Sequence, residues 1–168
     1  MLNQGRSSMR RCLGGQFFAL YLGMAIETQE GLEMRLRAHH LLCLLGFRGL
    51  GYSREYVENM SQIADQLRSF PETSIEVVGK PDDICSPCPF LGEKGCQQRG
   101  VESEERARGR DKDVMERLNM VTGDKITWSE VEKRLRSSIS PEDLDVICQD
   151  CQWLPQGYCV EGLKRLRD

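Results

Sequence analysis

Six of the eight cysteines fall into two triplets that share one spacing, C-x2-C-x7-C. The triplets are Cys85, Cys88 and Cys96, followed by Cys148, Cys151 and Cys159. A C-x2-C pair directs two sulfurs toward one point, and a third sulfur arrives after a short loop. This geometry suits a thiophilic metal ion or an iron–sulfur cluster. The spacing therefore predicts that both triplets are metal or cluster ligands.

Each triplet supplies three ligands, whereas a tetrahedral zinc ion or a cubane cluster usually takes four. The only two histidines, His39 and His40, stand beside Cys43. Residues three or four apart share one face of a helix, so Cys43 and one histidine can complete two four-ligand sets. Two other interpretations remain open. Cys43 lies among leucines and can be a small buried side chain, and a histidine near a helix start can serve as a cap or hydrogen-bonding group.

The spacing favours iron–sulfur, as one or two 4Fe–4S clusters, over zinc. Zinc ribbons pair one C-x2-C with another, whereas here each pair has its own third cysteine. Cys88-Pro89 is similar to the Cys-Pro step of ferredoxin motifs, although the complete ferredoxin run and the radical-SAM pattern C-x3-C-x2-C are absent. Zinc stays the main alternative, and thiol redox chemistry without metal is a further one.

The composition describes one soluble globular domain. The chain has 168 residues with 39% hydrophobic, 29% charged and 7% aromatic residues, and a net charge of −3. This charge balance does not favour nucleic-acid binding. Eight cysteines also fit a secreted disulfide framework, but the length and the local C-x2-C pairs favour ligand thiolates and a cytoplasmic protein.

Residues 1–33 resemble a weak signal segment, because Arg10 and Arg11 precede an apolar stretch from Phe17 to Ile26. The stretch is too short to span a membrane, which needs about 20 apolar residues. It also lacks a cleavage site. We therefore expect an N-terminal extension at 1–33, with Cys12 outside any site, and a cysteine-rich metal-binding or cluster-binding domain at 34–168.

The periodicity predicts a mainly α fold with minor β, a small helical domain with two loop-borne cysteine clusters. Six helices are expected, together with one short strand at 75–78. The helices are 38–46, about 53–70, 102–120, about 127–136, and two flanking the second triplet, from Ser140 and near the C-terminus. Prolines and glycines place the first triplet in a loop.

The acidic residues are predicted to lie at the surface. The run from Glu104 to Asp111 alternates in charge, which is typical of a solvated helix face. Asp82-Asp83 and Glu104-Glu105 are interpreted as turn and surface acids, because no paired-carboxylate motif surrounds them.

Three blocks of the chain resemble a known bacterial and archaeal family, domain of unknown function 1284. The blocks are Leu36–Ser53, Pro81–Cys85 and Gly157–Cys159, within a resemblance that covers about Met34 to Arg167. The resemblance implies iron–sulfur binding and a domain that begins near Met34. It implies no reaction or substrate.

Three functions compete on these grounds. The first is an iron–sulfur protein that transfers electrons to a redox partner protein or senses redox state. The second is a zinc-stabilised binding module without chemistry of its own. The third is an enzyme with an open cluster position, in which His39 or His40 acts as acid, base or ligand.

Overall fold

A three-stranded sheet begins the fold, in the order β1-β2-β5. The computed structural model describes residues 33–168, so the predicted extension and Cys12 lie outside the described residues. Strand β1 (Met34–Arg37) runs parallel to β2 (Ser74–Val78), and β5 (Lys125–Thr127) runs antiparallel on the other side of β2. A separate two-stranded hairpin pairs β3 (Leu91–Gly92) with β4 (Gly95–Cys96).

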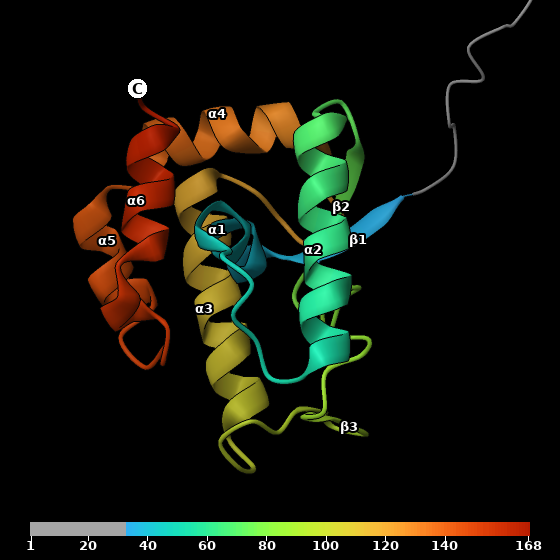
Figure 1. Ribbon diagram of the computed structural model, residues 1–168. Helices are drawn as coiled ribbons and strands as arrows, with labels where there is room; N and C mark the ends of the chain where they lie inside the picture. Colours follow the sequence, from blue (N-terminus) through green and yellow to red (C-terminus); the bar gives the residue numbers. More distant parts are fainter. Residues whose placement is uncertain (1–32) are drawn as a thin grey trace, which may run out of the picture. The chain divides into compact units, whose positions relative to one another are not determined.

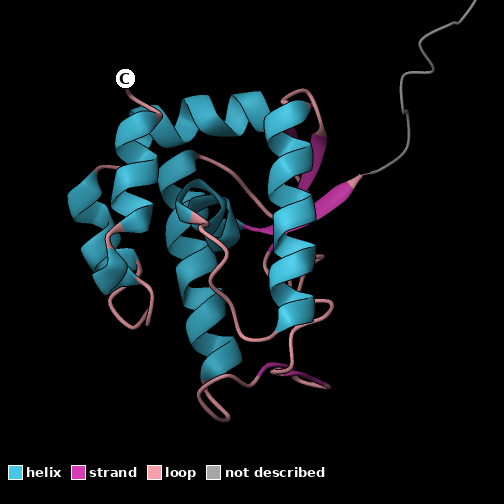
Figure 2. Cartoon of the chain, viewed as in Figure 1, coloured by secondary structure: helices cyan, strands magenta, loops and turns pink. Residues whose placement is uncertain are grey.

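Six α-helices and one short 3-10 helix make up about half of the described chain (Figure 2). Their bounds are α1 (Ala38–Gly46), α2 (Arg54–Ser69), α3 (Ser103–Leu118), α4 (Trp128–Ser138), α5 (Pro141–Ile147), η1 (Leu154–Gln156) and α6 (Tyr158–Arg165). Three of the helices have side-chain caps, because the side chains of Ser53, Thr127 and Ser140 each accept a backbone N–H of the following turn. The mainly α fold class with minor β is thus confirmed.

Helix α1 lies in the middle of the molecule, with α2, α3 and α6 around it (Figure 1). Seven of its nine residues are buried, and it packs closely against α3 and α6. Leu41, Leu42 and Leu44 join the hydrophobic core with side chains from every other long helix. A helix that is apolar on most sides is expected at such a central position.

The chain after β2 folds back along β1 and positions the first cysteine triplet. The backbone N–H groups of Arg35 and Arg37 donate to the carboxylates of Asp83 and Asp82, at 2.8 and 2.7 Å. The N–H of Asp83 returns a bond to the carbonyl of Arg35 at 3.2 Å. These contacts satisfy the outer edge of β1 and hold Cys85, two residues further on, beside the start of α1.

Strands β1 and β5 were not expected from the sequence. The segment Met-Arg-Leu-Arg carries no β-branched residue, so its local preference for a strand is weak. It is a strand because it pairs with β2 on one side and with the Asp82-Asp83 segment on the other. Among the described residues, none of the helices has the length and apolar character to cross a bilayer.

Candidate metal and redox site

Cys43 of α1 lies with the second cysteine triplet. Burial raises the pKa of the Cys43 thiol well above its ordinary value, and the neighbouring thiols Cys159, Cys151 and Cys148 raise it further. Helix α1, which carries Cys43, touches helix α6, which carries Cys159, at Gly46, and Gly46 lies one turn after Cys43. A Cβ added to Gly46 would lie 2.6 Å from the amide nitrogen of Cys159. Cys43 and Gly46 are three residues apart and share a helix face, so this close approach brings Cys43 toward Cys159.

The two C-x2-C pairs have the same backbone conformation. In the first, the N–H of Cys88 donates to the carbonyl of Cys85 at 2.9 Å, and the N–H of Leu91 donates to the carbonyl of Cys88 at 3.0 Å. In the second, the N–H groups of Cys151 and Leu154 make the equivalent bonds to Cys148 and Cys151, at 2.7 and 3.1 Å. The two pairs therefore share the same pattern of turn hydrogen bonds.

The third cysteine of each triplet arrives on a different element. Cys96 lies on β4, opposite Leu91 in the hairpin, whereas Cys159 lies in the first turn of α6. Cys96 is close enough to Cys88 for its charge to raise the Cys88 pKa, after the larger effect of burial. The two triplets therefore share their spacing and the turn hydrogen bonds of their C-x2-C pairs. They differ in the element that carries the third cysteine, which is a strand in the first triplet and a helix in the second.

Both cysteine sets face one cavity of about 120 Å³. The cysteines that line it are Cys43, Cys85, Cys88, Cys96, Cys151 and Cys159. Tyr52 lies between the two C-x2-C motifs, with its ring centroid 5.4 Å from that of Phe90 and 6.1 Å from that of Trp153. Phe90 and Trp153 each follow the second cysteine of a pair by two residues. The three rings therefore cover the space between the motifs and limit access of water.

Both histidines line the same cavity and are oriented by buried carboxylates. Nδ1 of His39 lies 2.6 Å from Oδ1 of Asp111, and Nδ1 of His40 lies 2.7 Å from Oδ2 of Asp82. Since each Nδ1 is engaged, Nε2 is the ring nitrogen that remains for a ligand in either histidine. Metal-binding histidines commonly show this arrangement, in which a carboxylate fixes the ring. Burial lowers the pKa of His39 to about 4, so its imidazole is neutral at pH 7.

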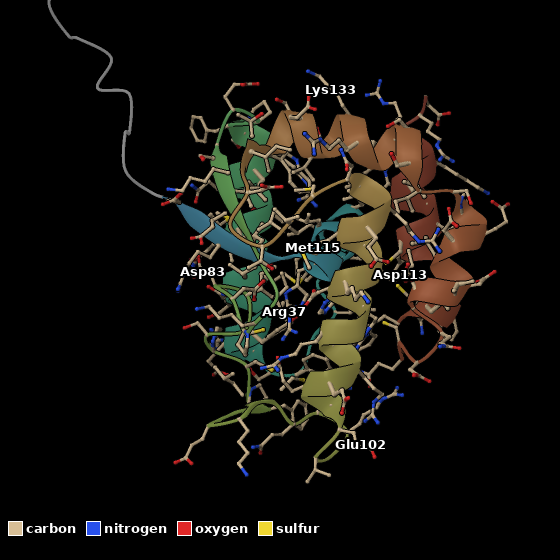
Figure 3. All side chains as sticks on the ribbon, turned by 180° about the vertical axis from the view of Figure 1, so that it is seen from behind. Arg37, Asp83, Glu102, Asp113, Met115 and Lys133 are labelled. Carbon is tan, nitrogen blue, oxygen red and sulfur yellow. The ribbon has the colours of Figure 1, made fainter. Side chains whose placement is uncertain are left out.

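Arg37 ties these carboxylates together beneath the site. Its guanidinium is 1% exposed and lies 2.7 Å from Asp111 Oδ2 and 3.0 Å from Glu104 Oε2. Figure 3 shows Arg37 beside α3, which carries both acids. Glu104 also accepts the N–H of Cys96 at 2.8 Å, which links this network to the first triplet. A buried charge network of this kind holds the histidines and β4 in fixed positions.

The prediction that these acids lie at the surface is wrong for three of them. Asp111 is fully buried, and Asp82 and Glu104 are 5% and 8% exposed. Burial alone would raise the pKa of Asp82, but the His40 imidazole and the backbone N–H groups hold it well below its ordinary value. These carboxylates remain charged inside the protein because the Arg37 guanidinium and hydrogen bonds from the histidine rings and the backbone stabilise them.

Local sequence signals do exist for these acids. Glu104 and Asp111 continue the apolar spacing of Ala107, Val114 and Leu118 on α3, so they fall on its buried face. Asp82 precedes Cys85 by three residues and accepts its N–H at 2.9 Å, which is the spacing of a side-chain-capped turn. The role of Arg37 has no comparable local signal, because its partners are 67 and 74 residues away.

Burial does not activate Cys148 and Cys159 as nucleophiles. Burial raises the pKa of Cys148 to about 12 and that of Cys159 to about 11. Reactive thiols in redox enzymes have the opposite shift, toward low pKa. The seven described cysteines are all free and half-buried. This donor set therefore suits a thiophilic metal centre, whose charge displaces the thiol protons.

Ligand spacing distinguishes a single ion from a larger centre. Among the described residues, the one set of three potential ligand atoms within 4.8 Å of one another is that of His40, Asp82 and Cys85. No three sulfurs in residues 33–168 are that close. A single zinc ion with Zn–S bonds of about 2.3 Å would bring its sulfurs to about 3.8 Å from one another. Sets of three thiols in the described residues are thus spaced more widely than one bound zinc ion would hold them.

Comparison with known proteins gave one match. The model of the family described as "Protein of unknown function (DUF1284)" matches residues 51–157, which include both C-x2-C pairs and Cys96. No curated protein and no solved structure matches the chain significantly.

Proposed function

We propose that this chain, which belongs to the DUF1284 family of proteins of unknown function, is an iron–sulfur protein that transfers electrons or senses redox state. The observation that carries the proposal is the position of Cys43. It lies with the second triplet, on a helix that is separated from that triplet by a hundred residues of chain. An all-thiolate set of four is a donor set for iron–sulfur clusters and for zinc.

In this proposal Cys43, Cys148, Cys151 and Cys159 hold one 4Fe–4S cluster. The first triplet, Cys85, Cys88 and Cys96, holds a second centre, with His40 as the candidate fourth ligand. Two features support His40 in that role. A ring nitrogen of His40 lies within 4.8 Å of the Cys85 sulfur, and Asp82 fixes the ring through Nδ1. His39 lies one residue away but is oriented by Asp111, so we assign it to the cavity wall.

A bound cluster would supply one-electron redox chemistry. The residues of this chain would then set its surroundings. Tyr52, Phe90 and Trp153 limit water at the centres, and the buried Arg37 network holds the supporting loops. Shielding from solvent and nearby charge are the two influences by which a protein adjusts a cluster potential. A redox partner protein and a cytoplasmic location belong to the same proposal, and the free thiols of the described chain are compatible with a reducing compartment.

An enzyme with an open metal position is the second candidate. It is favoured by one observation: both histidines, the three cysteines of the first set and three of the four cysteines of the second set face a shared cavity of about 120 Å³. If His40 does not ligate, the first centre has a free position that opens into this cavity. This volume is well below the range of about 300–1,000 Å³ that is typical of small-molecule sites, so only a small substrate would fit.

Metal and sulfide analysis of anaerobically purified protein tests the proposal. We expect iron and acid-labile sulfide, visible absorption that dithionite bleaches, and an electron paramagnetic resonance signal after reduction. Stoichiometric zinc without sulfide would replace the proposal with a zinc-stabilised module. Protein that is free of metal under these conditions, and that takes up neither iron nor zinc on reconstitution, would overturn both.

A further inference from the structure

A second and larger pocket lies on the other side of the α1–α6 contact. It has a volume of about 670 Å³ and is bounded by α1, α2, α4 and α6, whose arrangement can be followed in Figure 1. This volume falls within the range of about 300–1,000 Å³ that is typical of small-molecule sites. Phe47 and Arg48 line both this pocket and the cavity that the cysteines face. The pocket is therefore separate from the candidate metal site but shares a wall with it.

The floor of the pocket is apolar and well ordered by packing. Leu44, Ala64, Leu67 and Trp128 line it, and each is at most 4% exposed. The floor thus offers a packed apolar contact area for a ligand.

The rim of the pocket is positively charged. Arg48, Arg68 and Arg165 line it, against a single acid, Glu132. Arg48 and Arg165 each make one hydrogen bond to a backbone carbonyl, at 3.0 and 3.3 Å, which leaves most of their five N–H donors free. Arg68 pairs with Asp65 only at the exposed surface. Glu132 makes no ion pair with any described residue.

We infer that this pocket binds a small amphipathic anion, with an apolar body on the leucine and tryptophan floor and a carboxylate at the arginine rim. A planar guanidinium can bind a carboxylate through two parallel hydrogen bonds, which favours an acid over an alcohol of the same shape. The inference does not depend on the identity of any metal centre, because no cysteine of the described chain lines this pocket.

Calorimetric titration of the full-length purified protein with octanoate tests the inference, with octanol as the uncharged probe and octyl phosphate as the alternative anion. We expect octanoate to bind about tenfold more tightly than octanol, which corresponds to about 1.4 kcal/mol. Tighter binding of octyl phosphate than of octanoate would keep the anion site but overturn the carboxylate assignment. Equal affinity for octanoate and octanol, or no binding of either, would overturn the inference.

Two opposed variants separate a binding effect from a folding effect. We expect Arg165→Gln to weaken octanoate binding about threefold to tenfold, and Glu132→Gln to strengthen it, because the first removes a favourable charge and the second an unfavourable one. Arg136→Gln is the matched control, since Arg136 lies on α4 outside the pocket. Octanoate affinity that is unchanged in both test variants would overturn the inference. Because no readout involves metal, its failure is distinguishable from failure of the iron–sulfur proposal.

Discussion

The backbones of Gly46 in α1 and Cys159 in α6 are in direct contact. A methyl group at Gly46 would lie 2.6 Å from the Cys159 nitrogen and 2.8 Å from its sulfur. Gly162, one turn further along α6, is equally close to the carbonyl of Leu45. The two glycines permit a helix crossing that would be impossible with larger residues, and this crossing brings Cys43 to the second triplet. The four-cysteine set thus depends on two positions that carry no chemistry of their own.

Gly46→Ala should separate the two helices. We expect a loss of about 1–3 kcal/mol in the free energy of unfolding, as for other overpacked core positions, and a lower metal content per protein. Urea denaturation and metal analysis measure the two effects. Gly109→Ala is the control, because Gly109 is on α3 with no atom within 4 Å of the added methyl. That change should be neutral or stabilise by about 0.5–1 kcal/mol. Normal metal content in Gly46→Ala would show that the crossing does not control the site.

Cys43→Ser should remove the centre that the second triplet holds and leave the other. We expect iron and sulfide to fall to about half of the wild-type content, because a cluster that lacks one thiolate ligand is poorly retained. Cys12→Ser is the matched control and should retain full iron and sulfide, since no ligand role is proposed for Cys12. Equal iron and sulfide in Cys43→Ser and wild type would assign Cys43 to the hydrophobic core alone.

Asp82→Asn should destabilise the first triplet. Asp82 accepts backbone N–H groups from Arg37 and Cys85 and pairs with His40, and an amide cannot replace all three interactions. We expect a loss of about 1–3 kcal/mol, which is typical when a buried donor loses its hydrogen-bond acceptor. The neighbouring change Asp83→Asn, at a half-exposed surface pair, should cost no more than about 1 kcal/mol. Similar unfolding midpoints for the two variants would contradict the role given to Asp82.

Buried His39 should make the folded state less stable as the pH falls from about 6.5 to 4. Burial lowers its pKa to about 4, whereas the unfolded chain has the ordinary value near 6.5. In this window the unfolded state binds the additional proton, so stability increases with pH and is complete above about 6.5. The contribution is on the order of 3 kcal/mol, because each tenfold loss of proton affinity in the folded state corresponds to about 1.4 kcal/mol.

Denaturant titrations at pH 4.5 and 7 test this expectation. The difference in stability between the two pH values should be smaller in His39→Gln than in wild type, because glutamine does not titrate. An unchanged pH dependence in that variant would show that His39 titrates normally or that other groups dominate in this range.

The sequence by itself determined the helices and the local cysteine geometry. Ser53, Thr127 and Ser140 start helices because a short polar side chain accepts an N–H of the next turn, and this needs only neighbouring residues. The repeated C-x2-C spacing likewise goes with the same turn hydrogen bonds at Cys85–Cys88 and Cys148–Cys151. These features depend on separations of three or four residues, which a sequence shows directly.

Only the tertiary structure decided which distant groups meet. The approach of Cys43 to the second triplet depends on the glycine contact of α1 with α6, and the burial of Asp82 and Asp111 depends on Arg37, His39 and His40. The alternating charges on α3 predicted a solvated helix face. A charge pattern gives the types of the residues, but it does not show which residues of other elements pack against them. Long-range contacts arise from the packing of whole elements, so no local pattern contains them.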